Sequence, residues 1–146
     1  MGSFEDQVAA FEKNARRKMD LAVRRISLDI YKRVILKSPV DTGRFRGNWQ
    51  AAIGRAPSGT DDSDTWPQGD VVGGEGPIYF AKVAEADAKL FGAKAGDTIY
   101  LANNLPYAVR LEEGYSKTQA PQGMVALTVQ EFAAIVDEIG IELSRQ

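Results

Sequence analysis

The chain has 146 residues, of which 44% are apolar, and a formal net charge of −2. This length is sufficient for one domain with a buried core and is too short for a two-domain enzyme. The sequence contains no Cys and no His, which excludes disulfide scaffolds, cysteine nucleophiles, Ser-His-Asp triads and thiolate or imidazole metal sites. We therefore expect a single domain over residues 1–146 that uses no metal and no other cofactor.

Charge is distributed unevenly along the chain. Residues 1–55 carry twelve basic and six acidic side chains, a net of +6, whereas residues 56–146 carry six and fourteen, a net of −8. This division favours head-to-tail contacts between copies, or a fold in which the two halves of one chain pair with each other. No apolar run approaches the ~20 residues of a membrane span, so we expect no membrane contact and a protein that is made and used in the cytoplasm.

A long amphipathic helix is predicted over about residues 4–37. Ser3 is a typical helix N-cap and Asp6 adds an acidic first turn, after which apolar residues recur every three or four positions from Phe4 to Val34. At 1.5 Å per residue this helix is about 50 Å long, more than the ~25 to 30 Å width of a compact domain of this size. Part of it must therefore project, unless the helix kinks near Ser27. A projecting apolar stripe favours association with another chain.

The same helix carries basic side chains at intervals of seven or eight residues, opposite much of the apolar stripe. They could contact phosphates, form an ordinary solvated face, or dock against the acidic part of a neighbour. No aromatic residues interleave with them, which favours the second and third interpretations. The candidate interface residues, from both stripes, are Arg17, Arg24, Arg25, Ile26, Ile30, Lys32 and Arg33.

A turn follows the helix, because Pro39 cannot continue it. Its segment Asp41-Thr42-Gly43 matches the motif of retroviral-type aspartic proteases, in which two carboxylates share a proton. The context argues against a protease, since a long helix and a Pro precede the Asp and Arg44 follows it. We interpret Pro39, Asp41, Thr42 and Gly43 as a structural turn, in which Asp41 accepts backbone N–H groups and Gly43 has a positive φ. We expect no catalytic residue.

The remaining elements are shorter until the C-terminus. Alternation predicts strands over residues 48–53 and 98–102, separated by an acidic, mobile surface loop at 56–70 and a helix at 78–91. A short helix is expected with Pro106 in its first turn and Gly114 just past its end, and Pro121 is expected to open a C-terminal helix over about 121–144. The predicted class is α+β: a long N-terminal helix and a C-terminal helix packed on a small antiparallel sheet, in the region of about 44–104, with short helices inserted between strands.

Several blocks of sequence follow one another in an order typical of one protein family. The second half of the chain contains Pro106-Tyr107-Ala108, then the pair Glu112 and Gly114, then Ala120-Pro121 before the last helix. Together with the turn from Pro39 to Arg44 and with Asn48-Trp49, these blocks resemble the tail-completion or neck proteins of tailed double-stranded DNA bacteriophages. The resemblance covers most of the chain and departs from the family at residues 56–70 and 78–95.

The resemblance implies a structural virion protein that catalyses no reaction. Such proteins form rings, commonly of six or twelve copies, at the junction of head and tail. The implied partners are other copies of the chain, the connector or portal-side ring of the head, and the tail tube or terminator proteins, with packaged DNA passing through the ring without sequence-specific contacts. The implied location is the virion, after assembly in the host cytoplasm. The alternative is a DNA-binding module that uses the basic face of the first helix.

Overall fold

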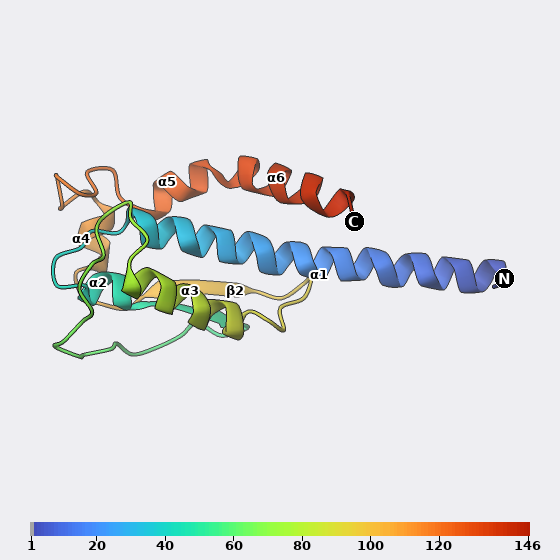
Figure 1. Cartoon of the computed structure of the whole chain (residues 1–146), viewed down its shortest axis with the longest axis horizontal. Coiled ribbons are helices and arrows are strands. Elements are labelled where there is room, and N and C mark those ends of the chain that lie inside the picture. Colours follow the sequence, from blue (N-terminus) through green and yellow to red (C-terminus); the bar gives the residue numbers. More distant parts are fainter. Residues whose placement is uncertain (1) are drawn as a thin grey trace.

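The computed structural model describes residues 2–146 and has an elongated shape (Figure 1). In this described range, six helices and two strands follow one another as α1 (Phe4–Lys37), α2 (Arg44–Gly47), β1 (Trp49–Ile53), α3 (Pro77–Lys89), β2 (Ile99–Asn103), α4 (Ala108–Glu112), α5 (Val125–Gln130) and α6 (Phe132–Ser144). The two strands pair antiparallel, from Trp49 opposite Asn103 to Ile53 opposite Ile99. The predicted α+β class is confirmed.

Helix α1 begins and ends where local sequence signals place it. Ser3 and Asp6 form a reciprocal capping box, in which the Ser3 hydroxyl accepts the Asp6 N–H at 3.2 Å and the Asp6 carboxylate accepts the Ser3 N–H at 3.2 Å. The helix passes through Ser27 without a break, so the alternative kink is wrong. Every residue from Phe4 to Asn14 is exposed, and this part of the helix extends away from the body (Figure 1). The expectation that part of the helix projects is confirmed.

The main core lies between the C-terminal half of α1, helix α3 and the sheet. Trp49 and Ala51 of β1 face inward, as the alternation predicted, and Trp49 donates its indole N–H to the Ser38 hydroxyl at 2.8 Å. This hydrogen bond fixes the start of the sheet to the end of α1. The other buried members of the cluster include Tyr31, Val34, Ile35, Phe45, Tyr79, Leu90, Leu105 and Met124.

A second apolar cluster joins α1 to α6. Ile135, Ile139 and Leu143 of α6 are buried against a row of partly buried residues of α1, namely Leu21, Ala22, Ile26 and Ile30. Helix α1 therefore lies between α6 on one side and α3 with the sheet on the other (Figure 1).

Apart from shifts of one or two residues at the ends of α3 and the strands, the structure differs from the sequence prediction in the helices near Pro106 and Pro121 and in helix α2. The C-terminal helix does not open at Pro121: α5 begins at Val125, and a break at Glu131 separates it from α6. Pro106 lies before α4, which begins at Ala108 and ends before Gly114 as expected. The single-turn helix α2 was not predicted.

Candidate functional site

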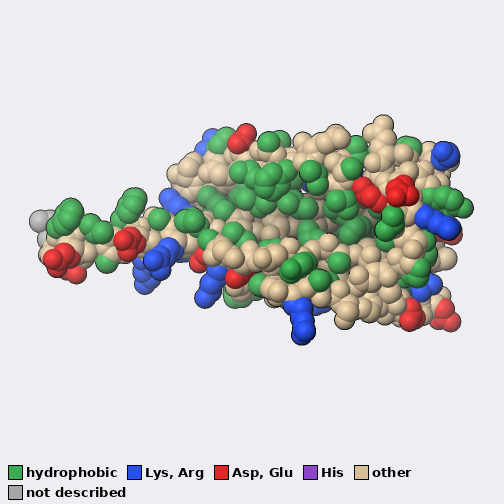
Figure 2. Space-filling model, turned by 180° about the vertical axis from the view of Figure 1, so that it is seen from behind, with side chains coloured by type: hydrophobic (Ala, Val, Ile, Leu, Met, Phe, Trp, Pro, Cys, Tyr) green, Lys and Arg blue, Asp and Glu red, His purple; other side chains and the backbone are tan. Residues whose placement is uncertain are grey.

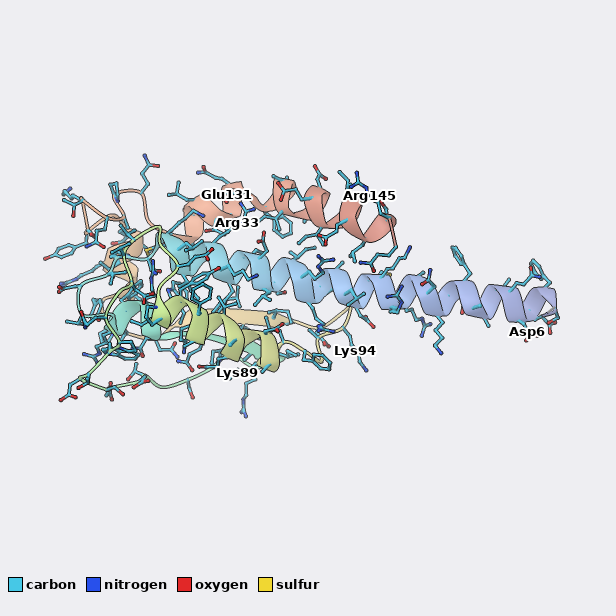
Figure 3. All side chains as sticks on the ribbon, viewed as in Figure 1. Asp6, Arg33, Lys89, Lys94, Glu131 and Arg145 are labelled. Atoms are coloured by element: carbon cyan, nitrogen blue, oxygen red, sulfur yellow. The ribbon has the colours of Figure 1, made fainter. Side chains whose placement is uncertain are left out.

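The interface between α1 and α6 uses part of the basic stripe within the chain itself. The Arg33 guanidinium pairs with Glu131 and with Asp29, the latter at 3.0 Å, and Lys37 lies 2.7 Å from Glu131. Arg33 and Glu131 point toward each other between the two helices (Figure 3). Farther along, Arg25 pairs with Glu142, and Lys32 lines a groove beside Glu138 and Glu142. The acidic and basic halves of the chain thus pair with each other at this interface.

These contacts change the acidity of their partners. The ammonium of Lys37 and the guanidinium of Arg33 hold the pKa of the Glu131 carboxyl below its ordinary value. The hydrogen bond to Glu131 in turn raises the pKa of Arg33. Both shifts favour the charged forms, so Glu131 and Arg33 stay ionised at neutral pH.

The apolar stripe of α1 is covered in one half of the helix and uncovered in the other. Ile26 and Ile30 pack beneath α6, so they are not the uncovered contact residues that the sequence analysis expected. Phe4, Phe11 and Met19 are 78%, 75% and 56% exposed, and Val8 is 40% exposed. Figure 2 shows apolar side chains along the upper edge of the projecting segment and charged side chains of both signs along its lower edge. We call these four residues, Phe4, Val8, Phe11 and Met19, the uncovered stripe.

A basic cleft lies where the segment after α3 meets α1. Arg24 stacks over the Phe91 ring, with its guanidinium carbon 4.4 Å from the ring centroid, and Phe91 itself is 69% exposed. No aromatic residue interleaves with the basic side chains in the sequence of α1, because Phe91 reaches them from a distant part of the chain. The cleft has a volume of about 430 Å³, and we define its members as Lys13, Arg16, Arg17, Arg24, Phe91 and Lys94.

The turn after α1 has the predicted backbone, but Asp41 is not its hydrogen-bonding residue. Gly43 has a φ of 96°, and a Cβ there would lie 2.5 Å from the Cδ1 of Ile78. Thr42 accepts the Arg44 N–H at 3.3 Å, whereas the exposed Asp41 carboxylate forms no hydrogen bond within residues 2–146. The expected Asx turn is therefore wrong, and Thr42 takes its place because its hydroxyl reaches the N–H two residues ahead.

The blocks that carry the family resemblance lie together at the end of the molecule remote from the N-terminus. The side chain of Gln119 accepts the Val40 N–H at 2.6 Å and donates to the Val40 carbonyl at 3.1 Å. Tyr107 packs on Phe45 with ring centroids 6.1 Å apart. This end also contains a groove lined in part by Pro39, Thr42, Gly43 and Leu111.

Glu112, which lies at this same end of the molecule, caps the start of helix α5. Its carboxylate accepts the N–H groups of Met124, Val125 and Ala126 at 2.8 to 2.9 Å, which are the first donors of α5. Gly123 permits this close approach, since a Cβ there would lie 2.3 Å from the Glu112 carbonyl oxygen. Gly114 packs closely beside it, since a Cβ there would lie 2.4 Å from the Pro121 carbonyl oxygen. Ala120 is buried and Ala108 packs against the main core, so most of these motif residues have structural contacts.

A buried ion pair was missed entirely by the sequence analysis. Arg46 is fully buried and donates to Asp70 at 2.9 Å, to the Gly74 carbonyl at 2.7 Å and to the Val71 carbonyl at 3.0 Å. Asp70 had been assigned to a solvated loop. The Asn48 side chain holds this loop at a further point, because it accepts the Asp61 N–H at 2.7 Å and donates to the Asp61 carbonyl at 3.1 Å.

Within residues 2–146 no three acidic side chains converge in a way that could hold a metal ion. The helices of the same range include none both long and apolar enough to cross a membrane. The chain matches no protein-family model, no curated protein and no solved structure.

Proposed function

We propose that this protein is a structural component of a tailed bacteriophage and forms a ring at the junction of head and tail. The observation that carries the proposal is the uncovered stripe on the projecting part of α1. A stripe of large apolar side chains along one edge of an otherwise solvated helix marks a protein contact. Because this part of α1 lies beyond the end of α6, another chain must supply the cover.

A second observation supports a joining role. The uncovered stripe and the groove beside Tyr107 lie at opposite ends of the molecule (Figure 1). Two different surfaces at opposite ends produce a head-to-tail contact, which closes into a ring when the rotation between copies permits. They equally allow each copy to contact two different neighbours. The sequence blocks that resemble neck proteins build one of these ends.

The proposed assembly contains several copies, with six or twelve as the expected numbers. Its partners are the connector or portal-side ring of the head and the tail tube or terminator proteins, and packaged DNA passes through it. Many copies bury modest contacts simultaneously, so avidity makes the joint resist the pressure of the packaged DNA. This role requires no catalysis, metal or cofactor.

Deletion of the gene from the parent phage tests the proposal. The expected result is that heads and tails still form but do not join, or that joined particles lose their DNA. Complementation with Phe11→Asp is expected to fail, whereas Phe80→Asp, which changes a 57% exposed Phe on α3 outside both contact surfaces, is expected to restore infectivity. Normal infectious particles from the deletion strain would contradict the proposal. A block in capsid assembly or DNA packaging would assign the protein to an earlier step.

A further inference from the structure

We propose that the basic cleft binds the phosphate backbone of duplex DNA without sequence preference. This inference does not depend on the proposed function, because it concerns a different face of α1 and is tested on the isolated protein. It starts from charge: residues 13–25 contain six basic side chains and one acidic side chain, in a chain whose net charge is negative. A local excess of this kind creates a positive field that attracts a polyanion.

The cations of the cleft have no carboxylate partners within the described residues. Lys13, Arg16, Arg17, Arg24 and Lys94 form no ion pair there, in contrast to Arg25 and Arg33, which pair with α6. The one acidic residue of the cleft is Asp20, and its carboxylate accepts the N–H of Ala95 at 2.9 Å. Asp20 therefore fixes the segment after α3 against α1, and five cations remain to interact with a ligand.

The geometry favours a phosphate backbone. Lys13, Arg17 and Arg24 follow one side of α1, and Lys13 and Arg24 are separated by about 16 Å at 1.5 Å per residue. Because the helix holds these three cations in a straight row, they can contact several phosphates along the backbone of a stiff duplex. The face of Phe91 holds the guanidinium plane of Arg24, which leaves the N–H edges of that guanidinium available for bidentate contact with phosphate oxygens. Lys94 lies in the segment that follows α3 (Figure 3) and adds a cation to the lining of the cleft.

The acidic side chains of a second copy that already pair within their own chain are poorer partners for the cleft. Glu131 and Glu142 pair with α1 of their own chain, and Glu85 pairs with Lys82 and Lys89. In the acidic loop, Asp62 pairs with Arg44, and Asp61 accepts hydrogen bonds from Ser63. These groups would have to give up an intramolecular contact before they could enter the cleft, whereas DNA brings free phosphates.

Fluorescence anisotropy with a labelled 20-base-pair duplex tests the proposal between 25 and 200 mM salt. The cleft variant carries Arg17→Gln, Arg24→Gln and Lys94→Gln. The control variant carries Lys89→Gln, Arg110→Gln and Lys117→Gln, which are exposed positions outside the cleft and give the same change in net charge. We expect the wild type to bind with an affinity that falls steeply with salt. The cleft variant is expected to bind at least about 10-fold more weakly at 25 mM salt, and the slope of log K against log salt is expected to fall by about 2 to 3, at ~0.9 per lost phosphate contact.

The control variant is expected to bind within about 2-fold of the wild type. Equal weakening of both variants would show a general charge effect and overturn the proposal, as would the absence of DNA binding by the wild type at 25 mM salt. Competition by poly-glutamate that equals competition by DNA, at the same concentration of charge, would assign the cleft to an acidic protein segment and also overturn it. If the triple variant does not fold, by circular dichroism, Arg17→Gln alone decides the test, because Arg17 is exposed and its side chain bonds, among residues 2–146, to Asn14 alone.

Discussion

The guanidinium of Arg46 lies 2.9 Å from the carboxylate of Asp70, and both side chains are closed to solvent. Asp70 also accepts the N–H groups of Ile78 and Tyr79 at 2.8 and 3.0 Å, in the first turn of α3. Arg46 in addition donates to the carbonyl of Leu36 near the end of α1. One ion pair therefore connects α1, α2, the acidic loop and α3.

Removal of one partner from this pair is expected to be strongly destabilising. Asp70→Asn leaves the Arg46 guanidinium buried without a counter-charge, so we expect the free energy of unfolding to fall by about 3 to 5 kcal/mol. Urea denaturation followed by circular dichroism measures the change. The matched control is Asp62→Asn, which removes an exposed carboxylate 3.1 Å from Arg44 and is expected to cost at most ~1 kcal/mol. If the two variants lost similar amounts of free energy of unfolding, burial of the ion pair would not determine the cost of removing its carboxylate.

The turn after α1 is expected to depend on Gly43 and not on Asp41. A side chain at Gly43 is strained by the positive φ and meets Ile78, so Gly43→Ala is expected to lower the free energy of unfolding by about 1 to 3 kcal/mol. Asp41→Asn changes an exposed carboxylate that forms no hydrogen bond in the described part of the chain, and we expect an effect within about 0.5 kcal/mol. Urea denaturation followed by circular dichroism compares the two variants with the wild type. Cleavage of peptide bonds by the wild type, abolished by Asp41→Asn, would contradict the structural interpretation of this turn.

The interface between α1 and α6 is expected to weaken in acid. Because the folded state holds the pKa of Glu131 below its ordinary value, its contribution is complete above the unfolded pKa of about 4.3 and is lost as the pH falls through the folded pKa. Glu131→Gln should therefore reduce the free energy of unfolding at pH 7, by about 1 kcal/mol or less because the carboxylate is partly exposed. The difference from wild type should shrink below pH ~4.3. Glu138→Gln is the control, since its carboxylate is 3.9 Å from Arg33 and largely exposed, and it should show little difference at any pH.

The parts of the fold that the sequence predicted are those with local causes. Helix α1 follows from the Ser3 and Asp6 capping box, the apolar period and Pro39, all of which act within a few residues. The two strands follow from alternation in the same way. Helix α5 starts later than Pro121 because its first N–H groups bond to Glu112, 12 to 14 residues earlier. No local pattern reports such a contact.

For the candidate surfaces too, the sequence does not report contacts between residues that lie far apart along the chain. Arg24 was assigned to a solvated or docking stripe because its aromatic partner, Phe91, comes from another element. The sequence marked Ile26 and Ile30 as apolar without indicating which chain covers them, and α6 of the same chain does. The excess of basic residues in the first part of the chain and of acidic residues in the second left two options open, pairing between copies or pairing within one chain. Arg25, Arg33 and Lys37 take the second option at α6.

Self-association is expected to depend on the uncovered stripe and not on the apolar residues beneath α6. Phe11→Asp places a charge in a dry contact between chains, so it should abolish assembly while leaving the free energy of unfolding unchanged, because Phe11 is 75% exposed in the isolated chain. Ile30→Asp places the charge beneath α6 and should instead lower the free energy of unfolding by about 2 kcal/mol or more. Analytical ultracentrifugation over a range of concentrations, together with urea denaturation, separates the two effects. The prediction would be contradicted if the wild-type protein stayed monomeric at every concentration and formed no ring in the assembled particle. The uncovered stripe would then not be a contact between copies.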